Sequence, residues 1–274
     1  MNVLQRIAVI AGYEWRRAIA KKWILALIVL ALTFEALYII LQSRFPATFL
    51  AEDVIWVFGV LSAQSLFIQL VAILIAGSSM SEEYERGTAD ILLSKPIKRI
   101  EYMAGKFLGG FSLLVLVEAS IAVTGVVLSF GFFGPQRDLH VFPLLFIAIV
   151  YASFLFFSLT FMFSELFRRS TMAMLVALGI FMVSSIVGSL LSYLYAVTNE
   201  VFYLDVSRLL PTWSAISLPT FLASEYITIP EGQFQFLPSG DVQLAAVIVA
   251  LYTIFFILMA SFRLVRSDVT KKAE

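Results

Sequence analysis

The chain has 274 residues, of which 61% are hydrophobic and only 14% are charged, and its formal net charge is zero. Soluble domains carry about 25% charged residues, so this composition indicates a membrane protein. The sequence has no cysteine, which excludes disulfides, thiolate metal sites and a cysteine nucleophile. It has one histidine, His140, which excludes the common histidine-rich metal motifs.

The first 22 residues predict an amphipathic helix. Its apolar face collects Leu4, Ile7, Ala8, Ala11, Trp15 and Ala18. Three basic residues, Arg6, Arg16 and Arg17, are expected to lie away from that face. A basic amphipathic helix with a tryptophan is typical of the membrane interface, so we expect an interfacial helix over residues 1–22. The alternative is an ordinary lead-in to the first span.

Six long apolar runs follow, each long enough to cross a bilayer as a helix. They cover Trp23–Leu41, Val54–Ser79, Phe107–Phe130, Val141–Ser164, Met172–Tyr195 and Leu244–Leu264. Helices satisfy their own backbone in lipid, and these runs are too long and unbroken for barrel strands. The sequence therefore predicts an all-α membrane protein with one transmembrane domain over residues 1–274.

The basic residues predict the orientation of the spans. Sixteen of the nineteen lysine and arginine residues fall on the side of the two termini. The other side has only Arg44, Arg137 and Arg208. Because basic loops remain in the cytoplasm, we expect both termini to be cytoplasmic and the protein to lie in the cell membrane.

The second span is expected to project from the membrane. If it continues to Arg86, a helix over residues 54–86 would be about 50 Å long, against a hydrocarbon core of about 30 Å. Its end is acidic, with Glu82, Glu83 and Glu85, and Gly87 then interrupts the helix.

A short cross-helix is predicted after this break. Thr88 is a plausible N-cap with Asp90 in the first turn, and Lys95-Pro96 would end the helix after Ser94. A further helix is then expected to begin near Lys98 and to run into the third span. Ile91, Leu92 and Leu93 give the cross-helix an apolar patch, which favours a partner's groove over a solvated loop.

The segment over residues 196–243 is expected to be extracellular. It is apolar and aromatic, and it is broken by Pro211 and Pro219. This pattern indicates short helices that dip into the outer leaflet or pack on the spans, rather than a disordered loop.

Two acids, Glu35 and Glu118, lie inside predicted spans. A charge inside a membrane is costly and is often functional, so either acid is a candidate polar contact in a translocation path or a proton-sensitive switch. The alternative is a neutral acid hydrogen-bonded to another helix. Two small-residue spacings, Gly105-x-x-x-Gly109 and Ser184-x-x-x-Gly188, permit close helix packing and a possible dimer contact.

No catalytic motif is found in the sequence. Gly105-Lys106 is followed by Phe107, and no glycine lies five residues earlier, so it is not a phosphate-binding P-loop. We therefore expect no cofactor in this chain and no enzymatic activity of its own.

The segment over residues 80–106 resembles the permease subunit of type-2 ATP-binding-cassette (ABC) transporters. The resemblance rests on Ser81-Glu82-Glu83-Tyr84-Glu85-Arg86-Gly87-Thr88, Ile91-Leu92-Leu93-Ser94-Lys95-Pro96-Ile97 and Gly105-Lys106. It is supported by Leu166-Phe167-Arg168-Arg169-Ser170, which is similar to the second inner loop of that family, and by the six spans.

The resemblance implies a half-transporter. Two permease chains, identical or homologous, would pair, and each would bind a separate ATPase subunit that holds ATP and Mg²⁺. ATPase coupling would fall to Glu82, Glu83, Glu85, Arg86, Gly87, Thr88, Ile91, Leu92, Leu93 and Pro96. Most such systems are exporters, so export is the expected direction of transport. The expected partners are the ATPase subunit, a second permease chain and membrane lipid, and nucleic acid is not expected.

Two other hypotheses stay open at this point. One is a non-transporting membrane anchor that recruits a soluble partner through the same patch. The other is an intramembrane enzyme that uses Glu35 and Glu118, and the lack of paired catalytic groups weighs against it.

Overall fold

The computed structural model describes residues 2–44, 52–88, 97–227 and 240–266, and all the regular secondary structure in these residues is helical. The helices up to the break after the second span are α1 (Val3–Ile19), α2 (Lys22–Arg44), η1 (Glu52–Val54), α3 (Ile55–Ala63), η2 (Gln64–Ile68), α4 (Gln69–Ser79) and α5 (Ser81–Glu85). The later helices are α7 (Arg99–Phe133), η3 (Leu139–Val141), α8 (Phe142–Phe167), α9 (Ser170–Thr198), α10 (Val201–Arg208), α11 (Pro211–Tyr226) and α12 (Val242–Arg266).

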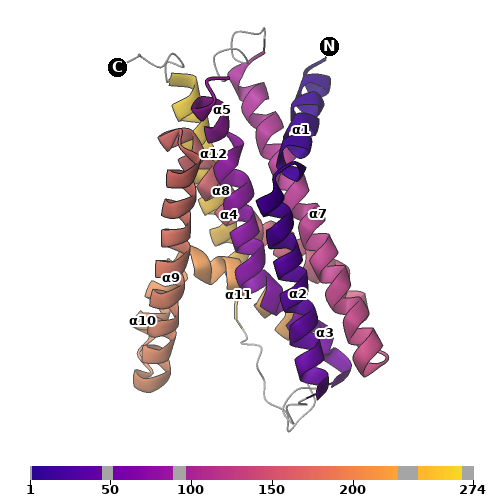
Figure 1. Cartoon of the computed structure of the whole chain (residues 1–274). Helices are drawn as coiled ribbons and strands as arrows, with labels where there is room; N and C mark the ends of the chain where they lie inside the picture. Colours follow the sequence, from indigo (N-terminus) through magenta and orange to yellow (C-terminus); the bar gives the residue numbers. More distant parts are fainter. Residues whose placement is uncertain (1, 45–51, 89–96, 228–239, 267–274) are drawn as a thin grey trace.

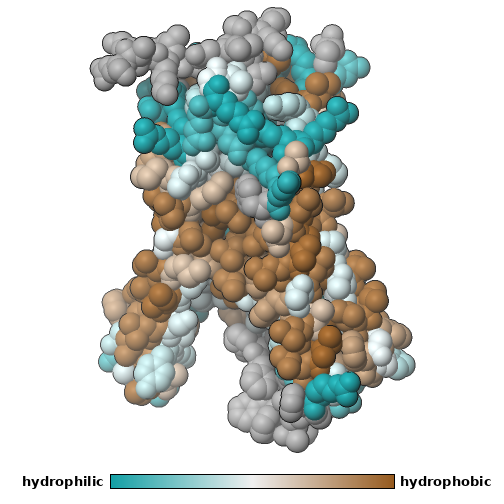
Figure 2. Space-filling model, in the orientation of Figure 1, coloured by the Kyte–Doolittle hydropathy of each residue, from teal (hydrophilic) through white to brown (hydrophobic). Residues whose placement is uncertain are grey.

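Six helices are long and apolar enough to cross a membrane, which confirms the predicted all-helical architecture. They form an elongated bundle in which α1 begins and α12 ends at the same end (Figure 1). Figure 2 shows a broad hydrophobic band across the middle of the visible face and a hydrophilic cap at that end. The α5 helix lies within this cap. We call the capped end of the bundle the polar end.

The second span is a continuous run of 34 residues, Glu52–Glu85, made up of the short helix η1, the α-helices α3, α4 and α5, and the π-type turn η2. It extends past its apolar part to the acidic residues, as the sequence predicts. A wide π-type turn at Gln64–Ile68 interrupts it in the middle, and Met80 separates α4 from α5. The sequence reasoning missed the π-type turn, a feature that is frequent at functional sites.

The longest helix, α7, forms one side of the bundle, and α1, α2, α3 and α4 all pack against it (Figure 1). It begins at Arg99 after the extended Lys98, where the sequence predicts a helix start. Its 35 residues give a length of about 52 Å, so it also projects beyond a bilayer core.

Two glycines of α7 allow α1 to pack very closely. A Cβ atom on Gly109 would stand 2.8 Å from the Cα of Ala11, and one on Gly105 would stand 2.7 Å from the Cβ of Ile10. The indole of Trp15 adds a hydrogen bond of 2.7 Å to Ser112 Oγ. The Gly105-x-x-x-Gly109 spacing is therefore occupied by a contact within the chain.

The segment over residues 196–243 contains two helices, α10 and α11. The α11 helix packs against α8, α9 and α12, and it buries Ala215 and Leu218 among them. Pro219 lies inside α11, and Pro211 stands in its first turn, where proline is well tolerated. Figure 1 shows α11 within the bundle, away from the polar end.

Candidate functional site

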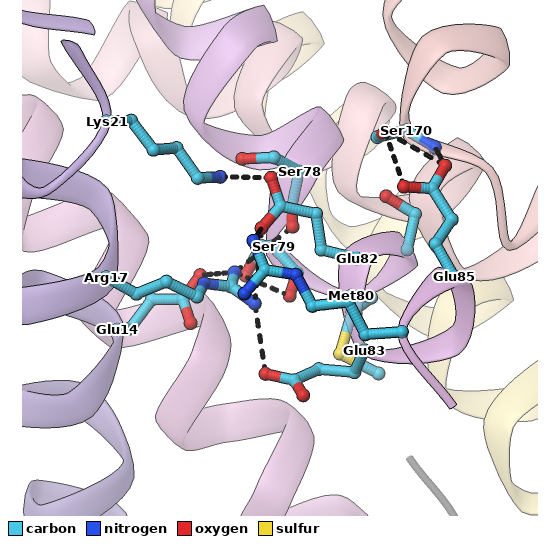
Figure 3. A network of polar contacts seen from close by, with 12 residues as sticks. Glu14, Arg17, Lys21, Ser78, Ser79, Met80, Glu82, Glu83, Glu85 and Ser170 are labelled. Carbon is cyan, nitrogen blue, oxygen red and sulfur yellow. Dashed lines mark hydrogen bonds and ion pairs between the residues drawn. The ribbon is translucent and has the colours of Figure 1, made fainter. Parts of the chain in front are cut away.

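The candidate site is a buried network of charges around α5 at the polar end (Figure 3). It joins the acidic end of the second span to α1 and α7. We call the following residues the junction network: Glu14, Arg17, Lys21, Glu82, Glu83 and Lys106. Its three carboxylates match its three cations, so it places no net charge inside the protein.

Lys106 is the most deeply buried member. It is 0% exposed, and its Nζ lies 2.8 Å from Glu14 Oε2 and 2.7 Å from Glu83 Oε1. The lysine therefore links α7 to α1 and α5 at once. Removing one partner from such a buried pair costs about 3–5 kcal/mol, because the remaining charge stays buried without compensation.

Arg17 of α1 joins the same network from the other side. Its guanidinium forms an ion pair with Glu14, and its Nη1 lies 3.0 Å from Glu83 Oε1. It also donates to the carbonyl oxygens of Ser78 at 3.1 Å and Ser79 at 2.9 Å, which lie at the end of α4. A cation is favourable there because the last carbonyls of a helix carry partial negative charge.

The structure corrects the prediction that Arg17 lies away from the packed face of the first helix. Burial alone would lower the pKa of Arg17, but the carboxylates of Glu14, Glu82 and Glu83 outweigh it and the pKa is raised. The arginine points inward because its ion pairs with these acids and its hydrogen bonds to the α4 carbonyls replace the hydration that it loses on burial.

Lys21 completes the network at its edge by forming an ion pair with Glu82. Burial lowers the pKa of Lys21, and the carboxylate of Glu82 offsets only part of this effect. Arg86 contacts the same carboxylate at 3.7 Å with a side chain that is 63% exposed. Glu82 is therefore shared between the buried network and the surface.

The other side of α5 is bonded to α8. The backbone N–H of Ser81 donates to Ser164 Oγ at 2.9 Å. The Tyr84 hydroxyl donates to both carboxylate oxygens of Glu165 at 3.0 Å, and the Arg168 guanidinium lies 4.6 Å from the Tyr84 ring centre. Glu165 is fully buried, so solvent cannot hydrogen-bond its carboxylate, and the Tyr84 hydroxyl supplies a hydrogen bond instead.

The last residue of α5 reaches α9. The carboxylate of Glu85 accepts hydrogen bonds from Ser170 N at 2.6 Å and from Ser170 Oγ at 3.0 Å (Figure 3). An acid at the first turn of a helix is stabilised by the free N–H groups there. With this contact, the five residues of α5 are bonded to α1, α7, α8 and α9.

Gly87 ends α5 in the way that the sequence predicts. Its φ is 67°, a left-handed value that favours glycine. The N–H of Gly87 donates to Tyr84 O at 3.2 Å and the N–H of Thr88 donates to Glu83 O at 3.0 Å, the pair of bonds of a Schellman motif. The Thr88 hydroxyl also donates to the Glu83 carboxylate.

The predicted coupling residues have different environments. Glu83 is buried and paired inside the chain, whereas Glu85, Arg86 and Gly87 are exposed and Glu82 and Thr88 are half-buried. Ile91, Leu92, Leu93 and Pro96, with the rest of the predicted cross-helix, lie outside the described residues.

The sequence reasoning missed Glu14, Arg17, Lys106 and Glu165 as members of the site. A signal was present for Glu14, because it lies three residues after Ala11 and four before Ala18, on the apolar face of α1. An acid on an apolar helix face requires a buried partner, and Lys106 is that partner.

The two intramembrane acids lie apart from the junction network. Glu35 of α2 is buried between Gly59 and Gly125, where added Cβ atoms would stand 2.7 and 2.4 Å from its Oε1. Glu118 lines a cavity of about 10 Å³ beside Gln64, at the π-type turn. That volume has room for about one water molecule. Neither carboxylate has a hydrogen-bond partner among the described residues.

Comparison with known families agrees with this architecture. A family model described as ABC-2 family transporter protein matches residues 8–269.

The chain belongs to the ABC-2 transporter family.

Comparison with curated proteins gives no match. With its six apolar helices, this ABC-2 chain is a multi-pass membrane component of a transporter. Among the described residues, no group of three or more histidine, aspartate or glutamate side chains is placed to hold a metal ion.

Proposed function

We propose that the chain is the permease subunit of an ATP-driven exporter and couples ATP hydrolysis in a separate ATPase subunit to substrate movement. The observation that supports this most is the bonding of α5 to four helices at the polar end. A helix of five residues has little stability alone, so these contacts fix its position. A displacement of α5 must therefore displace its partners or break buried polar contacts.

The ATPase is proposed to bind at the segment between α5 and α7. Glu85 and Arg86 are exposed at one side of this segment, and the predicted patch of Ile91, Leu92 and Leu93 follows in the chain. ATP and Mg²⁺ would be bound by the ATPase alone. Pro96 would end the contact segment before α7 begins.

Force applied to this segment can pass into the bundle through the contacts at both of its ends. At one end it reaches α5 through Gly87, and from there it passes to α8 through Ser164 and to α9 through Ser170. At the other end it reaches α7 directly, and Lys106 ties α7 back to α1. Both spans that border the segment would tilt together.

A second permease copy is proposed to face α4 and α9. The α9 helix is poorly covered by the rest of the chain, because its buried residues are only Ala173, Ala177, Phe181 and Ser184. Its exposed residues include Leu175, Val183 and Ile186. An apolar groove of about 340 Å³ lies between α2, α4 and α9. Its lining residues are Leu27, Leu70, Ile73, Leu74, Thr171, Met174, Leu175 and Leu178. A groove of this chemistry suits an apolar or amphipathic substrate.

The polar end is proposed to face the cytoplasm of a plasma membrane. It contains α1, α5 and the last turn of α12, where Arg263 and Arg266 lie. The basic residues of this end satisfy the positive-inside rule. The junction network would then lie at the inner membrane surface, where the ATPase can reach it.

A pull-down from native membranes tests the proposal. The tagged full chain should retain an ATPase with MgATP hydrolysis, and Arg86→Glu or Leu92→Asp should reduce the retained ATPase at least about fivefold, the loss of roughly 1 kcal/mol of binding. Arg44→Glu, an exposed arginine at the opposite end, is the matched control. A membrane anchor would retain a soluble partner without ATPase activity, and that result would reject the transporter proposal.

A further inference from the structure

A buried polar site lies in the apolar part of the bundle, where the second span faces α7. It contains Glu118 of α7 and Gln64 of the π-type turn, which are 2% and 1% exposed. Both side chains line the cavity of about 10 Å³, and the rest of its lining is apolar. Glu118 lies 12 residues after Lys106, or about 18 Å along α7, so the site is separate from the junction network.

Three side-chain oxygens at this cavity have no hydrogen-bond partner among the described residues. They are both carboxylate oxygens of Glu118 and Oε1 of Gln64. The Gln64 amide is fixed in place, because its Nε2 donates to the Ala215 carbonyl of α11 at 2.9 Å. Buried polar atoms are nearly always hydrogen-bonded, so these oxygens call for hydrogens that the surrounding apolar side chains cannot supply.

One water molecule and one proton meet this requirement. A cavity of this size holds about one water when polar partners surround it. A protonated carboxyl group would donate to the water, and the water would donate to Gln64 Oε1. A metal ion suits the site less well, because Ca²⁺ takes about six to eight oxygen ligands and the cavity offers three unpaired side-chain oxygens.

The helices packed against α7 bring no cation to Glu118. The α3, η2 and α4 helices have no titratable side chain. Glu35 of α2 lies against Gly125, seven residues and about 10 Å further along α7. The titratable groups in the apolar parts of the packed helices are Glu35 and Tyr38 on α2, Tyr151 on α8 and Tyr252 on α12. Their other titratable groups lie at the two ends of the bundle.

We propose that Glu118, Gln64 and one water molecule form a proton-binding site that is coupled to the packing of the second span on α7. With the proton bound, hydrogen bonds run from α7 through the water to the π-type turn and on to α11. On release, the carboxyl O–H bond breaks, the proton leaves with water, and a carboxylate remains. Because a buried charge without a cation is costly, the second span and α7 must then part to admit more water. The proposal does not depend on ATPase binding or on export.

Infrared spectroscopy of the purified full chain in detergent tests proton binding. The carbonyl stretch of a protonated carboxyl group is separate from the bands of a carboxylate, so the wild-type spectrum minus that of Glu118→Gln reports on Glu118. In neutral buffer the difference should contain a protonated-carboxyl band that shifts in D₂O. Alkaline buffer should convert it reversibly into carboxylate bands. A carboxylate in neutral buffer, or a protonated band that persists in every buffer in which the protein stays folded, would overturn the proposal.

The water bridge is tested at Gln64. Gln64→Leu removes the amide oxygen, so the Glu118 band should move to the higher frequency of a carboxyl group without a hydrogen bond. Gln69→Leu is the matched control, at a fully buried glutamine of the same span that does not line the cavity, and it should leave the band in place. Equal band positions in the two variants would overturn the bridge. Glu118→Asp keeps a carboxyl group on a shorter side chain, so it should move the band, and it serves if Glu118→Gln does not fold.

Amide hydrogen exchange tests the coupling to the second span. In alkaline buffer, peptides that contain Gln64–Ile68 should exchange several times faster in wild type than in Glu118→Gln, because only wild type acquires the buried charge. In neutral buffer the two proteins should exchange at the same rate. Equal rates in alkaline buffer would overturn the coupling.

Discussion

The Nζ of Lys106 lies 2.7 Å from the Oε1 of Glu83, and both side chains are buried at the polar end of the bundle. Lys106 belongs to the first turns of α7, and Glu83 belongs to the short helix that ends the second span. The two helices on either side of the proposed ATPase-binding segment are thus held together at its base.

Replacing this lysine should destabilise the protein strongly. Lys106→Met leaves the carboxylates of Glu14 and Glu83 buried with Arg17 as their main cation, and a loss of about 3–5 kcal/mol is expected. Thermal unfolding of the purified protein in detergent measures the loss. Lys22→Met, at an exposed lysine of α2, should change stability by less than about 0.5 kcal/mol. Equal melting temperatures for the two variants would contradict the assigned role of Lys106.

The contact between α1 and α7 can be tested at a single glycine. Gly109→Ala places a Cβ 2.8 Å from the backbone of Ala11, which cannot move aside as a side chain can, so a loss of about 1–3 kcal/mol is expected. Gly131→Ala is the control in the same helix, because nothing lies within 4 Å of its added Cβ. The control should be neutral or stabilising, since alanine favours helix formation. Stability unchanged by Gly109→Ala would mean that α1 does not pack there.

Much of the fold follows from the sequence because it depends on local patterns. Six apolar runs, the helix start near Lys98 and the helix end at Gly87 were all predicted and are observed. Each of these features depends on residues that are close together in the sequence.

The charge network could be predicted only in part, because its partners lie far apart in the chain. Glu14 meets Lys106 across 92 residues, and the periodicity of either helix alone does not identify that pair. The inward direction of Arg17 has the same cause, because its acceptors belong to the second span. The π-type turn at Gln64–Ile68 was not predicted from the sequence.

The end of α5 gives a prediction about backbone conformation. Gly87→Ala should cost about 1 kcal/mol, because alanine is strained at a φ of 67°, while Gly87→Asn should cost less. No described residue lies within 4 Å of a Cβ added at Gly87, so the expected difference comes from the backbone conformation. Chemical or thermal unfolding of the two variants measures it, and a greater loss for asparagine than for alanine would contradict the left-handed cap.

The link from α5 to α8 should depend on one hydroxyl group. Tyr84→Phe removes the donor that Glu165 accepts from and leaves a buried carboxylate without that bond, so a loss of about 1–3 kcal/mol is expected. Tyr226→Phe, at an exposed tyrosine of α11, is the matched control and should be neutral. Unfolding curves that coincide for Tyr84→Phe and wild type would show that the contact does not stabilise the fold.

Site-specific photo-crosslinking tests most directly whether the polar end binds an ATPase. A photoreactive amino acid replaces Arg86, which is 63% exposed beside the junction network, or Arg44, which is exposed at the opposite end. Irradiation of native membranes should attach an ATPase subunit to position 86 and leave position 44 without one. An ATPase attached at position 44, or an ATPase that co-purifies with the chain but never crosslinks at position 86, would contradict the account.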